Sequence, residues 1–229
     1  VEASLEAWNE WSKTELDYRI DIFRRAATLL AGKWRDTINA ATMLNQSKNA
    51  FQAEIDAACE LIDFFNFNAL YAKNIHNKQD LISPIGMKNS LEYRPLEGFI
   101  FAITPFNFTS IAGNLPTAPA IMGNVSIWKP ASSAVYACYF LMELLKEAGL
   151  PDGVINFLPG SGSTVGDPIL NHPSLAGVHF TGSTNTFNHI WKTIGSNIGQ
   201  YKTYPRIVGE TGGKDYCLAH ESCDIDVLV

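Results

Sequence analysis

Strand-like and helix-like segments alternate from residue 98 to about residue 210, and this alternation most constrains the fold. Five short apolar runs have the continuous hydrophobic character of strands that are buried on both faces. They lie at 99–103, 125–128, 154–158, 177–180 and 206–209. Helical stretches are expected between them, at about 111–122, at 133–148, from the loop at 159–163 to about residue 170, and at 186–198. The alternation therefore predicts an α/β fold with a doubly wound parallel sheet and right-handed crossovers.

The first 75 residues or so carry the period of amphipathic helices instead. One apolar face repeats every three or four residues through Leu16, Ile20, Phe23, Ala27 and Leu30. A second face keeps this rhythm on a longer helix, through Phe51, Ile55, Ala58, Ile62, Phe65 and Ala69. Both faces are expected to lie in the core.

The polar, turn-rich stretch 76–98 is expected to connect the helical part to the alternating part. A short extended piece is expected at 89–93, and the stretch could also be an arm that reaches a partner subunit. The chain is thus expected to divide into a helical segment with its connector, 1–97, and an α/β domain, 98–229. Near the end, 216–219 is a candidate strand, and 224–229 has the character of a beginning helix.

Composition argues against several classes of partner. Apolar residues make up 46% of the sequence and charged residues 17%, as in a well-packed globular protein. The net charge of -6 argues against nucleic acid, and no apolar run is long enough to cross a bilayer. Four irregularly spaced cysteines and five histidines without metal-ligand spacing predict neither a disulfide framework nor a metal site. A reducing compartment is expected.

Polar or glycine-rich loops follow the predicted strands. They lie at 104–108, 129–130, 159–163, 181–183 and 210–214. Since the carboxyl ends of parallel strands share one edge of a sheet, these loops are expected to converge, and ligands bind at that edge in such folds.

Glu210 is the carboxylate that the last of these runs carries onto a turn with two adjacent glycines, Gly212 and Gly213. Partial shielding there would raise the pKa of its carboxyl group and suit it to general-base work. A surface turn with a solvated glutamate explains the same residues equally well.

Four motifs at the strand ends carry a family resemblance. They are Thr-Pro-Phe-Asn-Phe at 104–108, Trp-Lys-Pro at 128–130, Phe-Thr-Gly-Ser at 180–183 and Gly-Glu-Thr-Gly-Gly-Lys at 209–214. Together they resemble the aldehyde dehydrogenase superfamily over nearly the whole chain. The stretches 45–65, 92–99 and 105–109 further resemble its 1-pyrroline-5-carboxylate dehydrogenase branch. That branch oxidises L-glutamate γ-semialdehyde to L-glutamate with NAD in proline breakdown.

The resemblance implies an organisation as well as a reaction. The alternating part would be a Rossmann-like NAD-binding domain, and the partner a small-molecule aldehyde rather than nucleic acid or a membrane. The complete enzyme would be a homo-oligomer in the cytoplasm, or in the mitochondrial matrix if the source is a eukaryote.

The resemblance also implies catalytic roles. In the family a cysteine thiolate attacks the aldehyde, and the side-chain amide of Asn107 would stabilise the resulting oxyanion. After hydride has left to the nicotinamide, water would hydrolyse the thioester with Glu210 as general base. Phe108 resembles an aromatic wall of the aldehyde tunnel.

The implied cofactor contacts come from several loops. Lys129 resembles the lysine that hydrogen-bonds the adenosine ribose, while Gly182 and Ser183 open a helix whose N-terminus can receive the pyrophosphate. The other expected cofactor residues are Thr104, Pro105 and Phe106, which would line the nicotinamide, with Gly160 and Gly212.

Three positions depart from the family pattern. Phe187 stands where the pyrophosphate loop often has a second glycine, and Ser132 stands where a glutamate often follows the ribose lysine. Asp215 replaces a more usual asparagine. A single firm ribose contact, from Lys129, is therefore expected.

The family nucleophile lies a few tens of residues after the general base, yet only 19 residues follow Glu210 in this 229-residue sequence. Cys217 is expected to be a buried strand thiol and Cys223 a loop or cap residue. The chain therefore resembles the cofactor-binding part of an enzyme, without the catalytic domain, and is expected to be inactive alone. Two alternatives remain: a non-catalytic dinucleotide-binding or interaction module, and a related semialdehyde or acyl-transferring enzyme that uses NADP.

Overall fold

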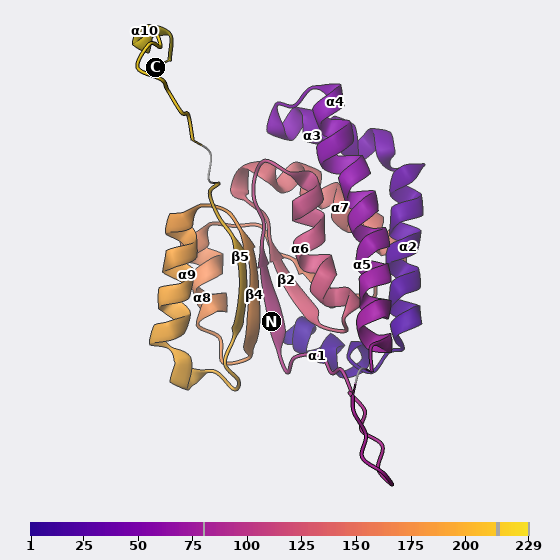
Figure 1. Cartoon of the computed structure of the whole chain (residues 1–229). Helices are drawn as coiled ribbons and strands as arrows, with labels where there is room; N and C mark the ends of the chain where they lie inside the picture. The colour runs from indigo at the N-terminus through magenta and orange to yellow at the C-terminus, as the bar shows by residue number, and fades with distance from the viewer. Residues whose placement is uncertain (80, 214–215, 229) are drawn as a thin grey trace.

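A five-stranded parallel sheet forms the centre of the computed structural model, which describes residues 1–79, 81–213 and 216–228 (Figure 1). The strand order is β3-β2-β1-β4-β5, so the chain winds outwards from β1 in both directions. The strands are β1 Phe99–Ile103, β2 Val125–Lys129, β3 Ile155–Phe157, β4 Leu175–Thr181 and β5 Arg206–Glu210. The predicted doubly wound α/β fold is confirmed, and each of the five expected runs forms a strand.

Helices cover both faces of the sheet (Figure 1). One face carries α8 Asp167–Leu170 and α9 Thr184–Ser196, preceded by the π-helix Gly162–Gly166. The other face carries α6 Thr109–Ile121 and α7 Val135–Glu147, with α2 Leu16–Ala31, α3 Arg35–Gln46 and α5 Glu60–Asn77 packed outside them. One continuous cluster of buried side chains joins these layers, and Phe23, Phe65, Phe101 and Trp128 belong to it.

Helix α1, Glu2–Trp11, lies at the end of the sheet where the strands begin (Figure 1). The indole nitrogen of Trp11 donates to the carbonyl of Ala120 at 3.0 Å, which attaches α1 to the end of α6. Trp11 is buried, so this contact lies within the core.

The second predicted apolar face is only partly correct, because a π-helix interrupts its helix. Helix α4, Ala50–Ala53, continues through the π-helix Glu54–Cys59 into α5. The wider π turn accommodates an extra residue and rotates everything before it relative to α5. Ala58, Phe65 and Ala69 are therefore buried, as expected, whereas Phe51 and Ile55 are exposed.

Two prolines inside α6, Pro116 and Pro119, leave carbonyl groups without helical donors. The carbonyl of Leu115, four residues before Pro119, lies 2.9 Å from Nδ1 of His179 on β4. Because a carbonyl only accepts, Nδ1 carries the proton and donates. Burial lowers the pKa of His179, which favours this neutral ring. His179 therefore has a structural role, through a hydrogen bond between α6 and the sheet.

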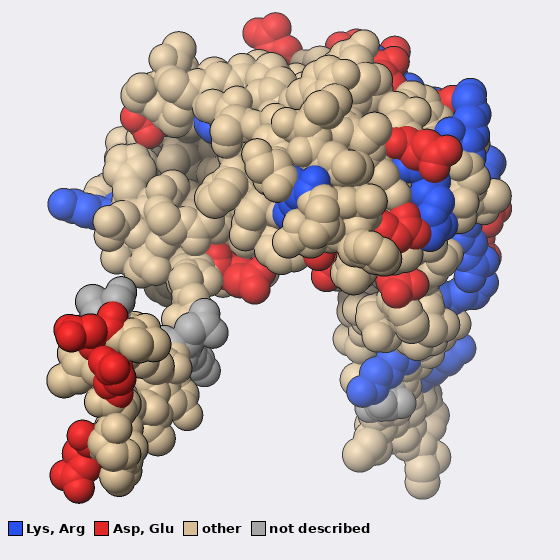
Figure 2. All heavy atoms as spheres, turned by 90° about the horizontal axis from the view of Figure 1, so that it is seen from above, with Lys and Arg blue, Asp and Glu red and all other residues tan. Residues whose placement is uncertain are grey.

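Two segments project from the body (Figure 1). The described residues of the arm, 78–97, contain no strand, so the extended piece expected at 89–93 does not form one. After β5 the chain runs outwards to α10, Ile225–Leu228, and the expected strand at 216–219 is wrong: Tyr216 and Leu218 are exposed, with no described strand beside them. Figure 1 shows the two segments at opposite ends of the molecule, and Figure 2 shows acidic side chains on the C-terminal one. Lys214, Asp215 and Val229 lie outside the described residues.

Gly98, which leads into β1, has a backbone φ of 135°, a conformation that side chains rarely tolerate. A Cβ added there would lie 2.2 Å from the carbonyl oxygen of Ser174. That oxygen accepts a hydrogen bond from the backbone N–H of Phe99 at 3.1 Å, so it is held in place.

The substitution Gly98→Ala should therefore lower the free energy of unfolding by about 3 kcal/mol, measured by urea denaturation. Gly86→Ala is the matched control, since Gly86 has a φ of 83° but nothing within 4 Å of an added Cβ. It should lower the free energy of unfolding by about 1 kcal/mol. Equal losses at the two positions would contradict a role for the clash with Ser174.

Candidate active site

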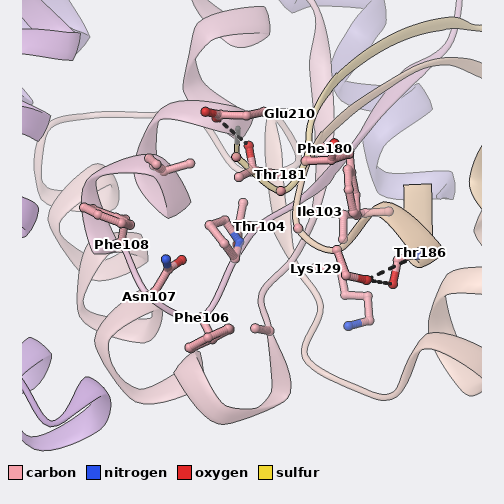
Figure 3. A pocket seen from close by; sticks show the side chains of 18 residues that line it. Ile103, Thr104, Phe106, Asn107, Phe108, Lys129, Phe180, Thr181, Thr186 and Glu210 are labelled. Atoms are coloured by element: carbon pink, nitrogen blue, oxygen red, sulfur yellow. Dashed lines mark hydrogen bonds between the residues drawn. The ribbon is translucent and has the colours of Figure 1, made fainter. Parts of the chain in front are cut away.

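A cavity of about 630 Å³ opens at the carboxyl ends of β1, β2, β4 and β5 (Figure 3). It is lined by Ile103, Thr104, Pro105, Phe106, Asn107, Phe108, Ile111, Lys129, Ala131, Phe180, Thr181, Gly182, Ser183, Thr186, Glu210, Thr211, Gly212 and Gly213. Figure 3 shows Asn107 and Phe108 on one side of the space, Lys129 and Thr186 on the other, and Glu210 above. Of the residues predicted for the site, only Gly160 is not among the described residues that line this cavity.

Gly160 lies beyond β3, outside the cavity. An added Cβ would come within 2.4 Å of a methyl group of Val165, so local packing already explains the glycine. Its carbonyl lies 3.5 Å from the hydroxyl of Ser132, the residue that stands where the family often has a glutamate. A cofactor contact at Gly160 stays a prediction.

The loop after β1 has a rigid base. Thr104 is buried, and its backbone N–H donates to the carbonyl of Lys129 at 3.1 Å. Its hydroxyl accepts a hydrogen bond from the indole nitrogen of Trp128 at 3.0 Å. Trp128 is itself fully buried beside Phe157, so a core side chain fixes the point from which the loop enters the cavity.

The outer part of this loop is open. Phe106 and Asn107 are exposed, and Phe108 is half-buried at the cavity wall. No described residue hydrogen-bonds the side-chain amide of Asn107, so its N–H groups are available to a ligand. An unpaired amide beside an apolar wall suits the capture of a developing oxyanion.

Lys129 ends β2 with its side chain almost fully buried. Its ammonium lies 3.3 Å from the carbonyl of Pro130, and burial lowers the pKa of this lysine below its usual value. The β2 end therefore presents a donor in a poorly hydrated setting, where a hydrogen bond to a ligand hydroxyl is strengthened.

The turn after β4 delivers a helix N-terminus to the cavity. Ser183 is the N-cap of α9, and its hydroxyl accepts from the backbone N–H of Thr186 at 3.2 Å. A Cβ at Gly182 would lie 2.8 Å from the ring of Phe180, so only glycine fits this turn without displacing the ring. The free N–H groups and the dipole of α9 favour an anion here.

Phe187, the departure from the family glycine pattern, has a packing partner. An added Cβ at Gly209 on β5 would lie 2.2 Å from the ring of Phe187. The ring therefore occupies the space above Gly209, and it also contacts Phe180 and Trp191. A large residue is accommodated in the first turn of α9 because the neighbouring strand has no side chain at that point.

Glu210 ends β5 at the cavity, but the shielding expected from the sequence is wrong for the described chain. Val208, Gly209 and Glu210 are all exposed, since β5 is an edge strand. The nearest donor to its carboxylate is the hydroxyl of Thr181 at 3.5 Å, a long hydrogen bond drawn in Figure 3. Its backbone is better fixed, because its carbonyl accepts from the N–H of Gly182 at 3.1 Å.

A second cavity of about 390 Å³ adjoins the first and shares Ile111, Phe180, Thr181 and Glu210 with it. Glu60 of α5 reaches this second cavity and accepts a hydrogen bond from Ser110. Glu60, Ile111 and Thr186 line these cavities but were not predicted as site residues. The helical period gave no signal for Glu60, because its position lies opposite the predicted apolar face through Ala58 and Ile62.

Among residues 1–79, 81–213 and 216–228, no cysteine lines the first cavity, and no group of three or more potential metal ligands occurs. Cys138 is buried, which raises the pKa of its thiol to about 12. Cys217 is exposed and outside any strand, so its predicted burial is wrong, while Cys223 lies in a loop as expected.

None of the described helices is both long and apolar enough to span a membrane.

The whole chain, residues 1–229, matches the model of the aldehyde dehydrogenase family. A mitochondrial delta-1-pyrroline-5-carboxylate dehydrogenase of Emericella nidulans is 49% identical over 227 residues, which cover 98% of this chain and 40% of that protein. The enzyme of the same name from Homo sapiens is 47% identical over 229 residues, all of this chain and 40% of that protein. The chain thus spans about 40% of the length of these curated relatives.

Solved structures agree with the sequence relatives. The delta-pyrroline-5-carboxylate dehydrogenase of Mycobacterium tuberculosis bound with NAD is 58% identical, with a TM-score of 0.93 over all of this chain and 42% of that one. A 1-pyrroline-5-carboxylate dehydrogenase from Thermus with bound NAD is 31% identical, with a TM-score of 0.87 over 93% of this chain and 41% of that one. Family match, relatives and fold agree, and the chain belongs to the aldehyde dehydrogenase family.

Proposed function

We propose that this chain is the NAD-binding part of an enzyme that oxidises L-glutamate γ-semialdehyde to L-glutamate in proline catabolism. The observation that carries the proposal is the meeting of Asn107, Lys129, Ser183 and Glu210 at one cavity, at the carboxyl ends of four different strands. The names of the relatives support the substrate, and the NAD-bound M. tuberculosis and Thermus structures support the cofactor.

The residues present fit a dinucleotide. The N-terminus of α9, capped by Ser183, offers backbone N–H groups to a pyrophosphate, and Gly182 keeps the approach free of a side chain. The buried ammonium of Lys129 can donate to a ribose hydroxyl. The rest of the cofactor would be lined by Thr104, Pro105, Phe106 and Gly212. When bound, NAD supplies the acceptor for the hydride that leaves the aldehyde carbon.

Asn107 acts in the first step of the proposed reaction, thiolate addition, and Glu210 acts in the last step, thioester hydrolysis. The Asn107 amide donates to the oxygen that becomes negative when a thiolate adds to the aldehyde carbon. Loss of hydride leaves a thioester, and Glu210 then takes a proton from the water that displaces the thiol and yields the carboxylic acid. Phe108 forms an apolar wall for the aldehyde chain.

The thiol for this reaction would come from outside the described residues, since no cysteine of theirs lines the cavity. In this proposal residues 1–97 form a helical layer with its connector, residues 98–229 form the cofactor-binding domain, and a catalytic domain completes the homo-oligomeric enzyme. The lack of a cysteine among the described residues that line the cavity also favours a second candidate function, a dinucleotide-binding module without turnover.

The 229-residue chain alone is expected to bind NAD and to show no NAD reduction with glutamate semialdehyde. The protein as encoded in full should turn over at about 1–1000 per second, followed by NADH absorbance. Turnover by the chain alone would contradict the missing nucleophile. Binding without turnover in both forms would favour the module, and a strong preference for NADP over NAD in a binding titration would contradict the cofactor.

Glu210→Gln in the protein as encoded in full should lower kcat by about 10²–10⁴-fold, because an amide cannot take the proton from the attacking water. The thioester should accumulate and be detectable by intact-protein mass spectrometry. Glu221→Gln, on the exposed C-terminal segment, is the control and should leave kcat unchanged. An unchanged rate in Glu210→Gln would contradict its assignment as general base.

Lys129→Met should change stability and cofactor binding in opposite directions. Burial places the folded-state pKa of Lys129 below its unfolded value of 10.5, so the charged lysine costs stability at pH 7. The variant should gain about 1 kcal/mol in free energy of unfolding at pH 7, and the gain should shrink as the pH rises towards 10.5. The affinity for NAD should fall about 10-fold, since a charged donor is lost.

Lys192→Met removes an exposed lysine from α9 and is the control for this comparison. It should change neither the free energy of unfolding nor its pH dependence appreciably. A loss of stability in Lys129→Met at pH 7 would show that the buried ammonium stabilises the fold.

A further inference from the structure

We propose that Lys48 is a positioning residue for the Asn107–Phe108 segment: its ammonium holds the Phe108 ring at the cavity wall from the helical layer. This inference rests on the proposed function for its kinetic consequence. It concerns a contact between residues 60 positions apart, carried by the turn between α3 and α4.

The contact itself is a cation over an aromatic face. The Nζ of Lys48 lies 4.2 Å from the centroid of the Phe108 ring, within the range at which a ring quadrupole attracts an ammonium. On its other side the ammonium pairs with Asp56 of the π-helix at 2.5 Å. The side chain of Lys48 is only 12% exposed, so water competes little with either contact.

The turn that carries Lys48 is fixed from both ends. Ser47 closes α3 with a φ of 55°, and among the described residues it is the only non-glycine with a positive φ. Asn49 opens α4 with a reciprocal capping box, in which the backbone N–H of Asn49 and that of Gln52 each donate to the other's side chain. Lys48 lies between these two anchors, so its direction is set by the backbone.

The end of α3, just before this turn, hydrogen-bonds the segments that follow Phe108 and β2. Gln46 donates to the hydroxyl of Thr109 at 2.8 Å, and the hydroxyl of Thr42 lies 2.8 Å from that same atom. Thr109 is fully buried and directly follows Phe108. Asn45 donates to the carbonyl of Ser133 and accepts from the N–H of Ala137, beyond the end of β2.

The loop from 104 to 109 is therefore held at both ends. Trp128 fixes Thr104 from the sheet, and the end of α3 fixes Thr109 from the helical layer. Between these points Asn107 and Phe108 have no hydrogen-bonded side-chain anchor among the described residues, so the cation–ring contact is what holds the ring. Asn107 directly precedes Phe108, so in this proposal the position of the ring also bears on the direction of the Asn107 amide.

The test compares Lys48→Met and Lys48→Arg in the protein as encoded in full. Lys48→Met keeps the aliphatic stem but loses the cation, and kcat/KM for glutamate semialdehyde should fall about 10-fold. The dissociation constant of NAD should stay within about 2-fold, because Lys48 contacts none of the proposed cofactor residues. Lys48→Arg keeps a cation that can stack on the ring and should recover kcat/KM to within about 3-fold of wild type.

Two further variants separate the ring contact from the ion pair. Lys73→Met is the matched control, since Lys73 forms an exposed pair with Asp17 at 2.9 Å and no ring contact, and it should leave kcat/KM unchanged. The double variant Lys48→Met with Asp56→Asn removes the unpaired carboxylate that the single variant leaves. It should recover thermal stability but not kcat/KM. Recovery of kcat/KM in the double variant would overturn the proposal.

Ring position is read directly by ¹⁹F NMR of protein labelled with 4-fluorophenylalanine, with the Phe108 signal assigned by Phe108→Leu. Lys48→Met should shift or broaden this signal. An unmoved signal, or a moved signal with unchanged kcat/KM, would overturn the proposal, as would a parallel loss of NAD affinity. If the wild-type protein oxidises no semialdehyde, the proposed function fails, and the Phe108 signal alone decides whether Lys48 holds the ring.

Discussion

The pairing register of the central strand is the constraint on which the rest of the site depends. In β1, Ile103 lies beside Lys129 of β2 and beside Phe180 of β4, while Thr181 of β4 lies beside Glu210 of β5. The strands thus end level with one another, and backbone hydrogen bonds continue past their ends from Thr104 to Lys129 and from Gly182 to Glu210. A slip of one residue in any pair would turn the side chains to the opposite face of the sheet and separate the loops.

The central strands were predictable because their signal is local. A strand buried on both faces must be apolar throughout, and β1 and β2 are almost fully buried along their length. The loops at one edge follow from parallel topology, so Asn107, Lys129, Ser183 and Glu210 could be expected at one site before any side chain was placed. Other features depend on distant contacts. The residues 216–219 have strand-like composition, but a strand also needs a partner, and none of the described strands lies beside Tyr216.

In the helical layer, too, local features could be predicted from the sequence and features that depend on distant contacts could not. Its periodicity predicts helices and most of their buried faces. The π-helix at Glu54–Cys59 cannot be recognised from the spacing of apolar residues, so Phe51 and Ile55 were wrongly predicted to be buried. The contact of this layer with the site could not be predicted either, because Lys48 and Phe108 come together only when the α3–α4 turn packs over the start of α6. A lysine in a polar turn has the sequence signature of a solvated side chain, whereas here it is largely buried.

For Glu210, position and reactivity have different physical origins. Its position follows from β4–β5 pairing and from the backbone bond to Gly182, both of which the described chain supplies. Its reactivity as a base depends on its surroundings, and these are set by what packs beside β5. In the described chain β5 is an exposed edge strand and the carboxylate faces water. The sequence could therefore place this carboxylate at the cavity, whereas its exposure follows from the edge position of β5 in the sheet.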